Sequence, residues 1–120
     1  MTRILAVDDS PSMRGIVRIA LSGAGFEVTE AADGAEALEI ARKDSFDLVL
    51  SDVNMPHMDG ISLIRALRAE AAYKHTPILM LTTESSAERK REGKDAGATG
   101  WIIKPFDPEQ LVATMQRVLR

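Results

Sequence analysis

Acidic side chains follow two apolar segments of the 120-residue chain, at the point where each segment ends. Asp8 and Asp9 come directly after residues 4–7, and Asp52 comes shortly after residues 48–50. Carboxylates that are packed closely together repel one another, and some take up a proton unless a cation lies between them. Carboxylate oxygens are hard ligands that suit Mg²⁺, Mn²⁺ or Ca²⁺. If the fold brings these three side chains together, they form a candidate metal site.

A hydroxyl and an ammonium group follow two further apolar segments. Thr82 comes after residues 78–81, and Lys104 comes after residues 101–103. A divalent cation and a lysine beside a carboxylate can offset the charge of an incoming phosphoryl group. Asp52 is ionised at neutral pH and needs no base to attack phosphorus, so an aspartyl phosphate can form. A few ligands on short loops favour Mg²⁺, which shares its coordination shell with phosphate oxygens.

Each of these residues also has a purely structural interpretation. The aspartates suit turns and helix N-caps, Thr82 suits a cap, and Lys104 suits an exposed strand end. Such roles explain the residues singly, but they do not explain why all five fall at the ends of apolar segments. The joint placement of five polar groups favours a functional site.

Five short apolar runs predict the strands that carry these residues. They lie at residues 4–7, around residue 28, and at residues 48–50, 78–81 and 101–103. All but the second are nearly continuous, which is typical of strands covered on both faces.

Segments with helical spacing lie between the strands and after the last one. Ser10 is the predicted N-cap of the first helix, with Pro11 at the first helical position. Ser85 and Glu88 form a capping-box pattern for the fourth helix, and Asp107 begins the fifth. The apolar residues expected to face the sheet are Met13, Ile16, Val17, Ala20, Leu21, Ala37, Leu38, Ala41, Leu63, Ile64, Leu67, Leu111, Met115 and Val118.

Five strand–helix units in succession predict an α/β fold, a doubly wound parallel sheet with right-handed crossovers and helices on both faces. The carboxyl ends of parallel strands share one edge, where ligands of open α/β sheets bind. The fourth helix, at residues 86–96, carries many charges and only small apolar groups. We expect it to be an exposed helix that is weakly held to the core.

Composition restricts the class of protein further. The chain length fits one domain, residues 1–120. The formal net charge of −3 argues against a nucleic-acid partner, and the lack of cysteine excludes disulfides and thiolate metal sites. No apolar run is long enough to span a membrane, and the first residues do not form a signal peptide. We therefore expect a cytoplasmic single-domain protein without membrane insertion.

In order and spacing, the motifs of the whole chain resemble the receiver domain of two-component response regulators. The motifs are Val7-Asp8-Asp9-Ser10, Ser51-Asp52-Val53-Asn54-Met55-Pro56, Asp59-Gly60, Leu81-Thr82-Thr83-Glu84, Gly97-Ala98 and Lys104-Pro105-Phe106. Each motif alone is weak, but the complete set is specific. The resemblance implies the flavodoxin-like or CheY-like (βα)5 fold, with strand order 2-1-3-4-5.

The resemblance also implies how the site is used. Asp52 would accept a phosphoryl group. Asp9, Asp52 and the backbone carbonyl of Asn54 would bind Mg²⁺ directly, and Asp8 would bind it through water. Lys104 would pair with the phosphoryl group, next to a cis peptide bond before the proline that follows it.

A switch between two surface states is implied as well. Thr82 would hydrogen-bond to the phosphoryl oxygen, and Trp101 would then move inward and change the surface formed by residues 86–96, 101–103 and the fifth helix. The indole is larger than the tyrosine or phenylalanine usual at this position, so Trp101 could instead be a packing residue. Asn54 and Glu84 match the pair associated with rapid phosphate loss in chemotaxis regulators.

Partners follow from the same resemblance. The phosphodonor would be a CheA-like histidine kinase. Output would be binding of the phosphorylated chain to the flagellar motor switch protein or another protein, and the unphosphorylated chain would be a monomer. Arg89, Lys90 and Lys94 could steer an acidic peptide to the switch surface. The chain would be no enzyme beyond assisting its own phosphorylation and dephosphorylation.

Alternative interpretations remain at this stage. The chain could be a stand-alone phosphorelay receiver or a receiver excised from a longer regulator. More remotely, it could be an aspartate-nucleophile phosphatase of the haloacid dehalogenase type, but Ser10 stands where that class needs a second acid.

Overall fold

Strands and helices alternate along the chain. The computed structural model describes residues 2–55, 57–83 and 87–119. The elements are β1 (Arg3–Val7), α1 (Pro11–Gly23), β2 (Glu27–Ala31), α2 (Gly34–Lys43), β3 (Leu48–Asp52), α3 (Gly60–Arg68), the 3₁₀ helix η1 (Ala71–Tyr73), β4 (Ile78–Thr83), α4 (Ala87–Ala96), β5 (Gly100–Lys104) and α5 (Pro108–Val118). The strands pair in parallel in the order β2-β1-β3-β4-β5, which confirms the predicted fold and strand order.

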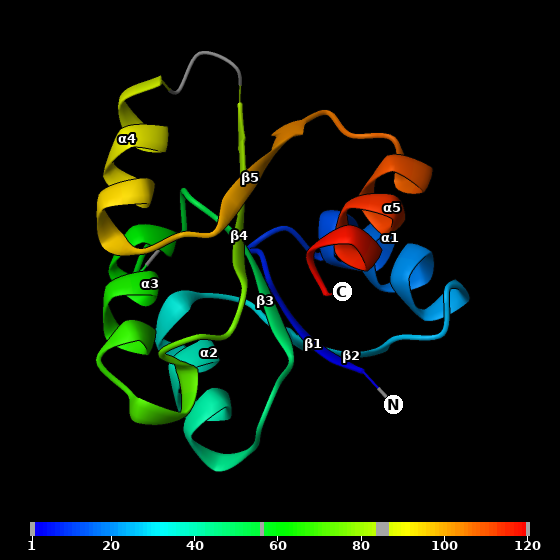
Figure 1. Ribbon diagram of the computed structural model, residues 1–120. Helices are drawn as coiled ribbons and strands as arrows, with labels where there is room; N and C mark the ends of the chain where they lie inside the picture. Colours follow the sequence, from blue (N-terminus) through cyan, green and yellow to red (C-terminus); the bar gives the residue numbers. More distant parts are fainter. Residues whose placement is uncertain (1, 56, 84–86, 120) are drawn as a thin grey trace.

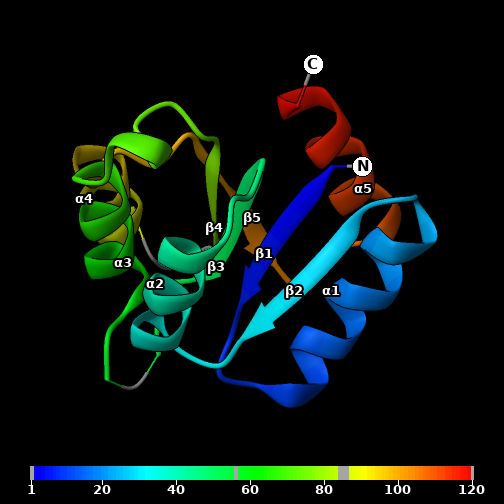
Figure 2. The same ribbon diagram turned by 90° about the horizontal axis from the view of Figure 1, so that it is seen from below.

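Helices cover both faces of the sheet. Helices α1 and α5 lie on one face, and α2, α3 and α4 lie on the other (Figures 1 and 2). Successive side chains of a strand point to opposite faces, so β1 contributes Ile4 and Ala6 to the core under α1 and α5, and Leu5 and Val7 to the core on the other face. Strands β1, β3 and β4 are buried almost throughout, as their continuous apolar runs predict.

Strand β5 lies at the edge of the sheet and is not covered on both faces, which corrects the prediction for this run. The side chain of Trp101 is 40% exposed. Helix α1 departs from its prediction in the same way, because Ile16 is 47% exposed although its spacing places it with the inner residues. Apolar sequence alone does not reveal whether a neighbouring element exists to cover a side chain.

The predicted helix starts are confirmed where the structure describes them. The Ser10 hydroxyl accepts a hydrogen bond from the Met13 N–H at 3.2 Å, and Pro11 is the first residue of α1. Asp107 caps α5 in a similar way by accepting from the Glu109 N–H at 3.0 Å. The predicted capping box of the fourth helix depends on Ser85, which lies outside the described residues.

Helix α4 meets the core through small residues, since Gly93 is buried and the partly buried Ala96 packs against the core. Only Gly93 of this helix is buried, and a Cβ at this position would overlap the thioether group of Met80 on β4. The remaining residues of α4 are mostly charged and partly or fully exposed, as the sequence predicts. None of the helices in the described part of the chain has the length and apolar character needed to cross a membrane.

Arg3 joins the start of the sheet to the turn between α2 and β3. Its guanidinium donates to both carboxylate oxygens of Asp44 and to the Ser45 carbonyl at 2.9 Å. The guanidinium carbon also lies 5.0 Å from the centre of the Phe46 ring. The hydrogen bonds from Arg3 lower the pKa of Asp44 from its ordinary 3.8 to about 2.

We expect Asp44→Asn to be less stable than the wild type at pH 7, with a difference that narrows as the pH falls below 4. A carboxyl whose pKa is lower in the folded state stabilises the fold above its unfolded pKa, here 3.8, and loses this contribution as the pH falls through the folded value of about 2. Urea denaturation of both proteins at a series of pH values measures the difference. If the difference in free energy of unfolding between the two proteins stays constant from pH 7 to pH 3, the lowered pKa of Asp44 is contradicted.

Candidate metal centre

The carboxyl ends of four adjacent strands carry the polar residues of the candidate site. Asp8 follows β1, Asp52 ends β3, Thr82 lies next to the end of β4, and Lys104 ends β5. Asp52 is paired with Leu81, the residue before Thr82. The structure therefore gathers at one edge the side chains that the sequence places at separate strand ends.

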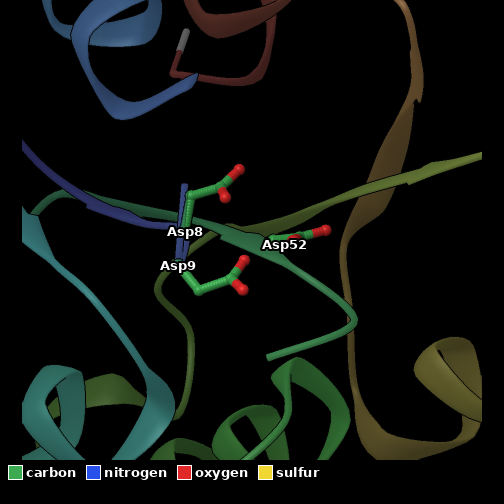
Figure 3. A group of neighbouring side chains, drawn as sticks. All are labelled: Asp8, Asp9 and Asp52. Atoms are coloured by element: carbon green, nitrogen blue, oxygen red, sulfur yellow. The ribbon is translucent and has the colours of Figure 1, made fainter. Parts of the chain in front are cut away.

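Three carboxylates form a cluster at this edge. One oxygen atom from each of Asp8, Asp9 and Asp52 lies within 4.8 Å of the others, and the side chains extend toward the same side of the strand ends (Figure 3). Asp8 is 3% exposed and Asp52 is 7% exposed, whereas Asp9 lies at the surface. The cluster is thus closed by the sheet on one side and open beside Asp9.

Lys104 supplies a positive charge to the cluster. Its Nζ donates to Oδ1 of Asp52 at 2.9 Å and lies 3.6 Å from Oδ2 of Asp8. The Val53 N–H donates to the same Asp52 oxygen at 2.9 Å. The Lys104–Pro105 peptide bond is cis, as predicted. One ammonium group offsets only part of the charge of three ionised carboxylates.

The carboxylate of Asp8 is the least well satisfied group of the cluster. Burial raises the pKa of Asp8 above its ordinary value, and the nearby Asp52 carboxylate raises it further, against a lowering effect of the Ser10 N–H. That N–H donates to Oδ1 at 2.9 Å. Oδ2 is buried and accepts no hydrogen bond from the part of the chain that the structure describes. A buried oxygen without a donor is costly, and a bound cation would remove this cost.

The loop between β3 and α3 is built tightly against Asp52. The Gly60 N–H donates to the Val53 carbonyl at 2.9 Å and closes the base of the loop. A Cβ at Gly60 would overlap the backbone carbonyl oxygen of Asp52, so only glycine fits where α3 begins. Asn54, the predicted carbonyl ligand, belongs to this loop and lies two residues after Asp52 in the sequence.

Arg89 has a role that the sequence does not reveal. The sequence groups it with Lys90 and Lys94 as cations that could steer an acidic partner, which stays a prediction, and the structure adds a contact of Arg89 within the chain. Its Nη2 donates to Oδ1 of Asn54 at 3.3 Å, and its side chain is 31% exposed. The contact joins α4 to the edge of the site. No sequence signal predicts it, because it depends on how α4 is placed against a distant loop.

The predicted switch residues differ in their surroundings. Thr82 is buried, with 4% of its surface exposed. Trp101 points outward on β5, and the Nζ of Lys90 on α4 lies 5.6 Å from the centre of its ring. Glu84, predicted to affect phosphate loss, lies outside the described residues. The roles given to these residues therefore stay predictions.

Comparison with known proteins identifies the family. Residues 4–116 match the model of the response regulator receiver domain, so the chain belongs to that family. It is 43% identical to the chemotaxis protein CheY-3 of Vibrio cholerae over 117 residues, which are 97% of this chain and 90% of the relative. The solved structure of the V. cholerae chemotaxis response regulator CheY4 is 58% identical, covers 98% of both chains and has a TM-score of 0.94.

A more distant relative was solved with a metal. The receiver domain of the sensor histidine kinase PA1611 from Pseudomonas aeruginosa has a magnesium ion coordinated in its active-site cleft. It is 30% identical to this chain, with a TM-score of 0.91 and coverage of 98% of this chain and 97% of that one. The chain described here is thus a receiver domain of the CheY-like type, and it carries a cluster of three aspartates at the carboxyl ends of β1 and β3.

We expect Asp8→Asn to raise the free energy of unfolding in the absence of divalent cations. The amide keeps an acceptor for the Ser10 N–H but carries no charge. The substitution therefore removes the cost of burying the carboxylate, and we expect the free energy of unfolding to rise by about 1 kcal/mol. Mg²⁺ should then stabilise the wild type more than the variant. Urea denaturation with EDTA and with millimolar Mg²⁺ measures both effects. Equal stabilisation of the two proteins by Mg²⁺ would show that Asp8 does not contribute to the metal site.

Proposed function

We propose that this receiver transmits a signal by accepting a phosphoryl group on Asp52 from a histidine kinase. The observation that carries the proposal is the position of Asp52, buried at a strand end between the Lys104 ammonium and two further carboxylates. The hydrogen bonds that described residues donate to its side chain, from Lys104 and from the Val53 N–H, go to Oδ1. These donors fix the orientation of the carboxylate through Oδ1.

The proposed transfer has a simple balance of bonds. A carboxylate oxygen of Asp52 attacks the phosphorus of a phosphohistidine, an O–P bond forms and the P–N bond breaks. The imidazole nitrogen keeps the electron pair and takes up a proton. Lys104, within 3.6 Å of both Asp8 and Asp52, is placed to move its ammonium to the phosphoryl oxygens. The Thr82 hydroxyl would donate to another of them.

We propose Mg²⁺ as the metal of the site. Asp9, Asp52 and the backbone carbonyl of Asn54 would hold it, with Asp8 acting through water. When bound, the ion offsets the charge of the phosphoryl oxygens and of the crowded carboxylates. The orphaned Oδ2 of Asp8 and the three oxygens within 4.8 Å support this ligand set, and the magnesium in the PA1611 receiver is consistent with it.

We propose that phosphorylation alters the surface formed by α4, β5 and α5, and that this surface binds the flagellar motor switch protein. Trp101 and Lys90 lie on it, and neither is buried. The similarity to chemotaxis proteins over nearly the whole chain supports this pathway. In this proposal residues 1–120 act as one receiver domain, and output is binding rather than catalysis on another substrate.

Phosphorylation of Asp52 is tested by incubating the protein with Mg²⁺ and acetyl phosphate and measuring its intact mass. We expect the wild type to gain the mass of one phosphoryl group and Asp52→Asn to gain none, because an amide nitrogen or oxygen is a far weaker nucleophile than a carboxylate. Asp95→Asn is the matched control, because Asp95 is an exposed aspartate on α4, and it should be phosphorylated like the wild type. Phosphorylation of Asp52→Asn would assign the acceptor to another residue.

The choice of partner is tested with a labelled peptide from the amino terminus of the flagellar switch protein. We expect phosphorylation to raise the affinity for this peptide about tenfold, within the range usual for coupling between two sites. Fluorescence anisotropy of the peptide measures the affinity, and the emission of Trp101 reports the change of surface. An affinity that does not depend on phosphorylation would remove the motor from the proposal and leave the phosphoacceptor role intact.

A further inference from the structure

Arg89 reaches from α4 to the loop between β3 and α3, and the phosphoryl chemistry proposed above does not use it. Its Nη2 donates to Oδ1 of Asn54 at 3.3 Å and lies 3.6 Å from Oδ2 of Asp59. Its Nη1 donates to Oε2 of Glu92 at 3.3 Å, one turn further along α4. A single guanidinium thus contacts three acceptors, and two of them belong to the loop.

These two acceptors lie at opposite ends of the loop. Asn54 comes two residues after Asp52, and Asp59 is the N-cap of α3, where it accepts from the Ser62 N–H at 2.8 Å. The base of the loop is closed separately, by the backbone hydrogen bond from Gly60. Arg89 therefore adds a second connection, from both ends of the loop to α4.

The chemistry of the contact requires arginine. A guanidinium is a planar group with donors in a fixed fork, whereas the lysine ammonium is a point charge that cannot span two acceptors in the same way. The side chains of Arg89, Asp59 and Glu92 are only 31%, 34% and 40% exposed. Partial burial reduces screening by solvent, so these contacts restrict the loop more than a fully exposed pair would.

We propose that Arg89 is a positioning residue for the metal, because it holds the loop so that the backbone carbonyl of Asn54 stays in place beside Asp9 and Asp52. This inference rests on the proposed function, since it uses the proposed ligand set. It adds a route between the site and α4, which is separate from Thr82 and Trp101. By thermodynamic linkage, the placement of α4 and the occupancy of the metal then affect each other by equal factors.

Positioning and charge make opposite predictions for Mg²⁺ affinity. If Arg89 acted only as a nearby cation, its removal would relieve repulsion and tighten Mg²⁺ binding, and lysine would replace it without effect. If Arg89 positions the loop, both Arg89→Lys and Arg89→Gln weaken binding. We expect a loss of about tenfold in both, the lower end of the range found for residues that hold a metal ligand in place.

The experiment is isothermal titration calorimetry with Mg²⁺ on the full chain. Arg91→Gln is the matched control, because Arg91 is an exposed cation on the same helix; it should bind Mg²⁺ as tightly as the wild type or slightly more tightly. Arg89→Lys with unchanged affinity would overturn the proposal, and so would tighter binding by Arg89→Gln. Thermal unfolding without metal confirms that each variant is folded.

A second variant and a spectroscopic readout keep the test independent of folding defects in the first. Asn54→Ala removes one of the two loop acceptors of Arg89, so Arg89→Lys should cost less Mg²⁺ affinity in that background than in the wild type. If the losses of Mg²⁺ affinity in the two single variants add fully in the double variant, Arg89 does not act through Asn54. The Mg²⁺-induced change in Trp101 emission, which reports α4 through Lys90, should be smaller in Arg89→Lys at saturating Mg²⁺. A wild type that binds no Mg²⁺ would instead refute the proposed function itself.

Discussion

Repulsion between carboxylates at the ends of β1 and β3 is the constraint on which the site depends. The sheet holds oxygen atoms of Asp8, Asp9 and Asp52 within 4.8 Å of one another, two of them on buried residues. Among the described residues, only the ammonium of Lys104 forms ion pairs with these carboxylates. Folding places these charges together because the strands that carry them are parallel and adjacent. The binding of a cation, as proposed above, would offset the free-energy cost of this arrangement, so these residues would contribute more to binding than to stability.

Much of the fold could be predicted because the core strands leave a clear pattern. The strands at 4–7, 48–50 and 78–81 are continuous apolar runs, and each is buried on both faces. The strand order came from the family resemblance rather than from the pattern. Trp101 and Ile16 were misjudged because exposure depends on whether another element lies alongside, and local sequence carries no record of this. The short helix η1 left no signal either, since Tyr73 is held by distant carbonyls of Ala41 and Asp44.

The site divides in the same way between what spacing determines and what packing determines. The sequence alone predicts that Asp8, Asp52 and Lys104 lie close together, because the carboxyl ends of parallel strands share an edge. The sequence does not predict the contact of Arg89 with Asn54, because the two residues are 35 positions apart and the contact depends on how α4 is placed in the fold. Long, flexible cations on a charged helix have no periodicity that distinguishes a structural contact from a solvated one.

The shallow packing of α4, in which Gly93 is the one buried residue of the helix, has a consequence for how this kind of protein diversifies. Because no other residue of α4 is buried, the helix can exchange nearly all its side chains without opening a cavity in the core. Mutations that suit a new binding partner can therefore accumulate there at little expense to folding, while the glycine that rests on Met80 stays fixed. Duplicated copies of such a gene could diverge in specificity while they keep one shared chemistry.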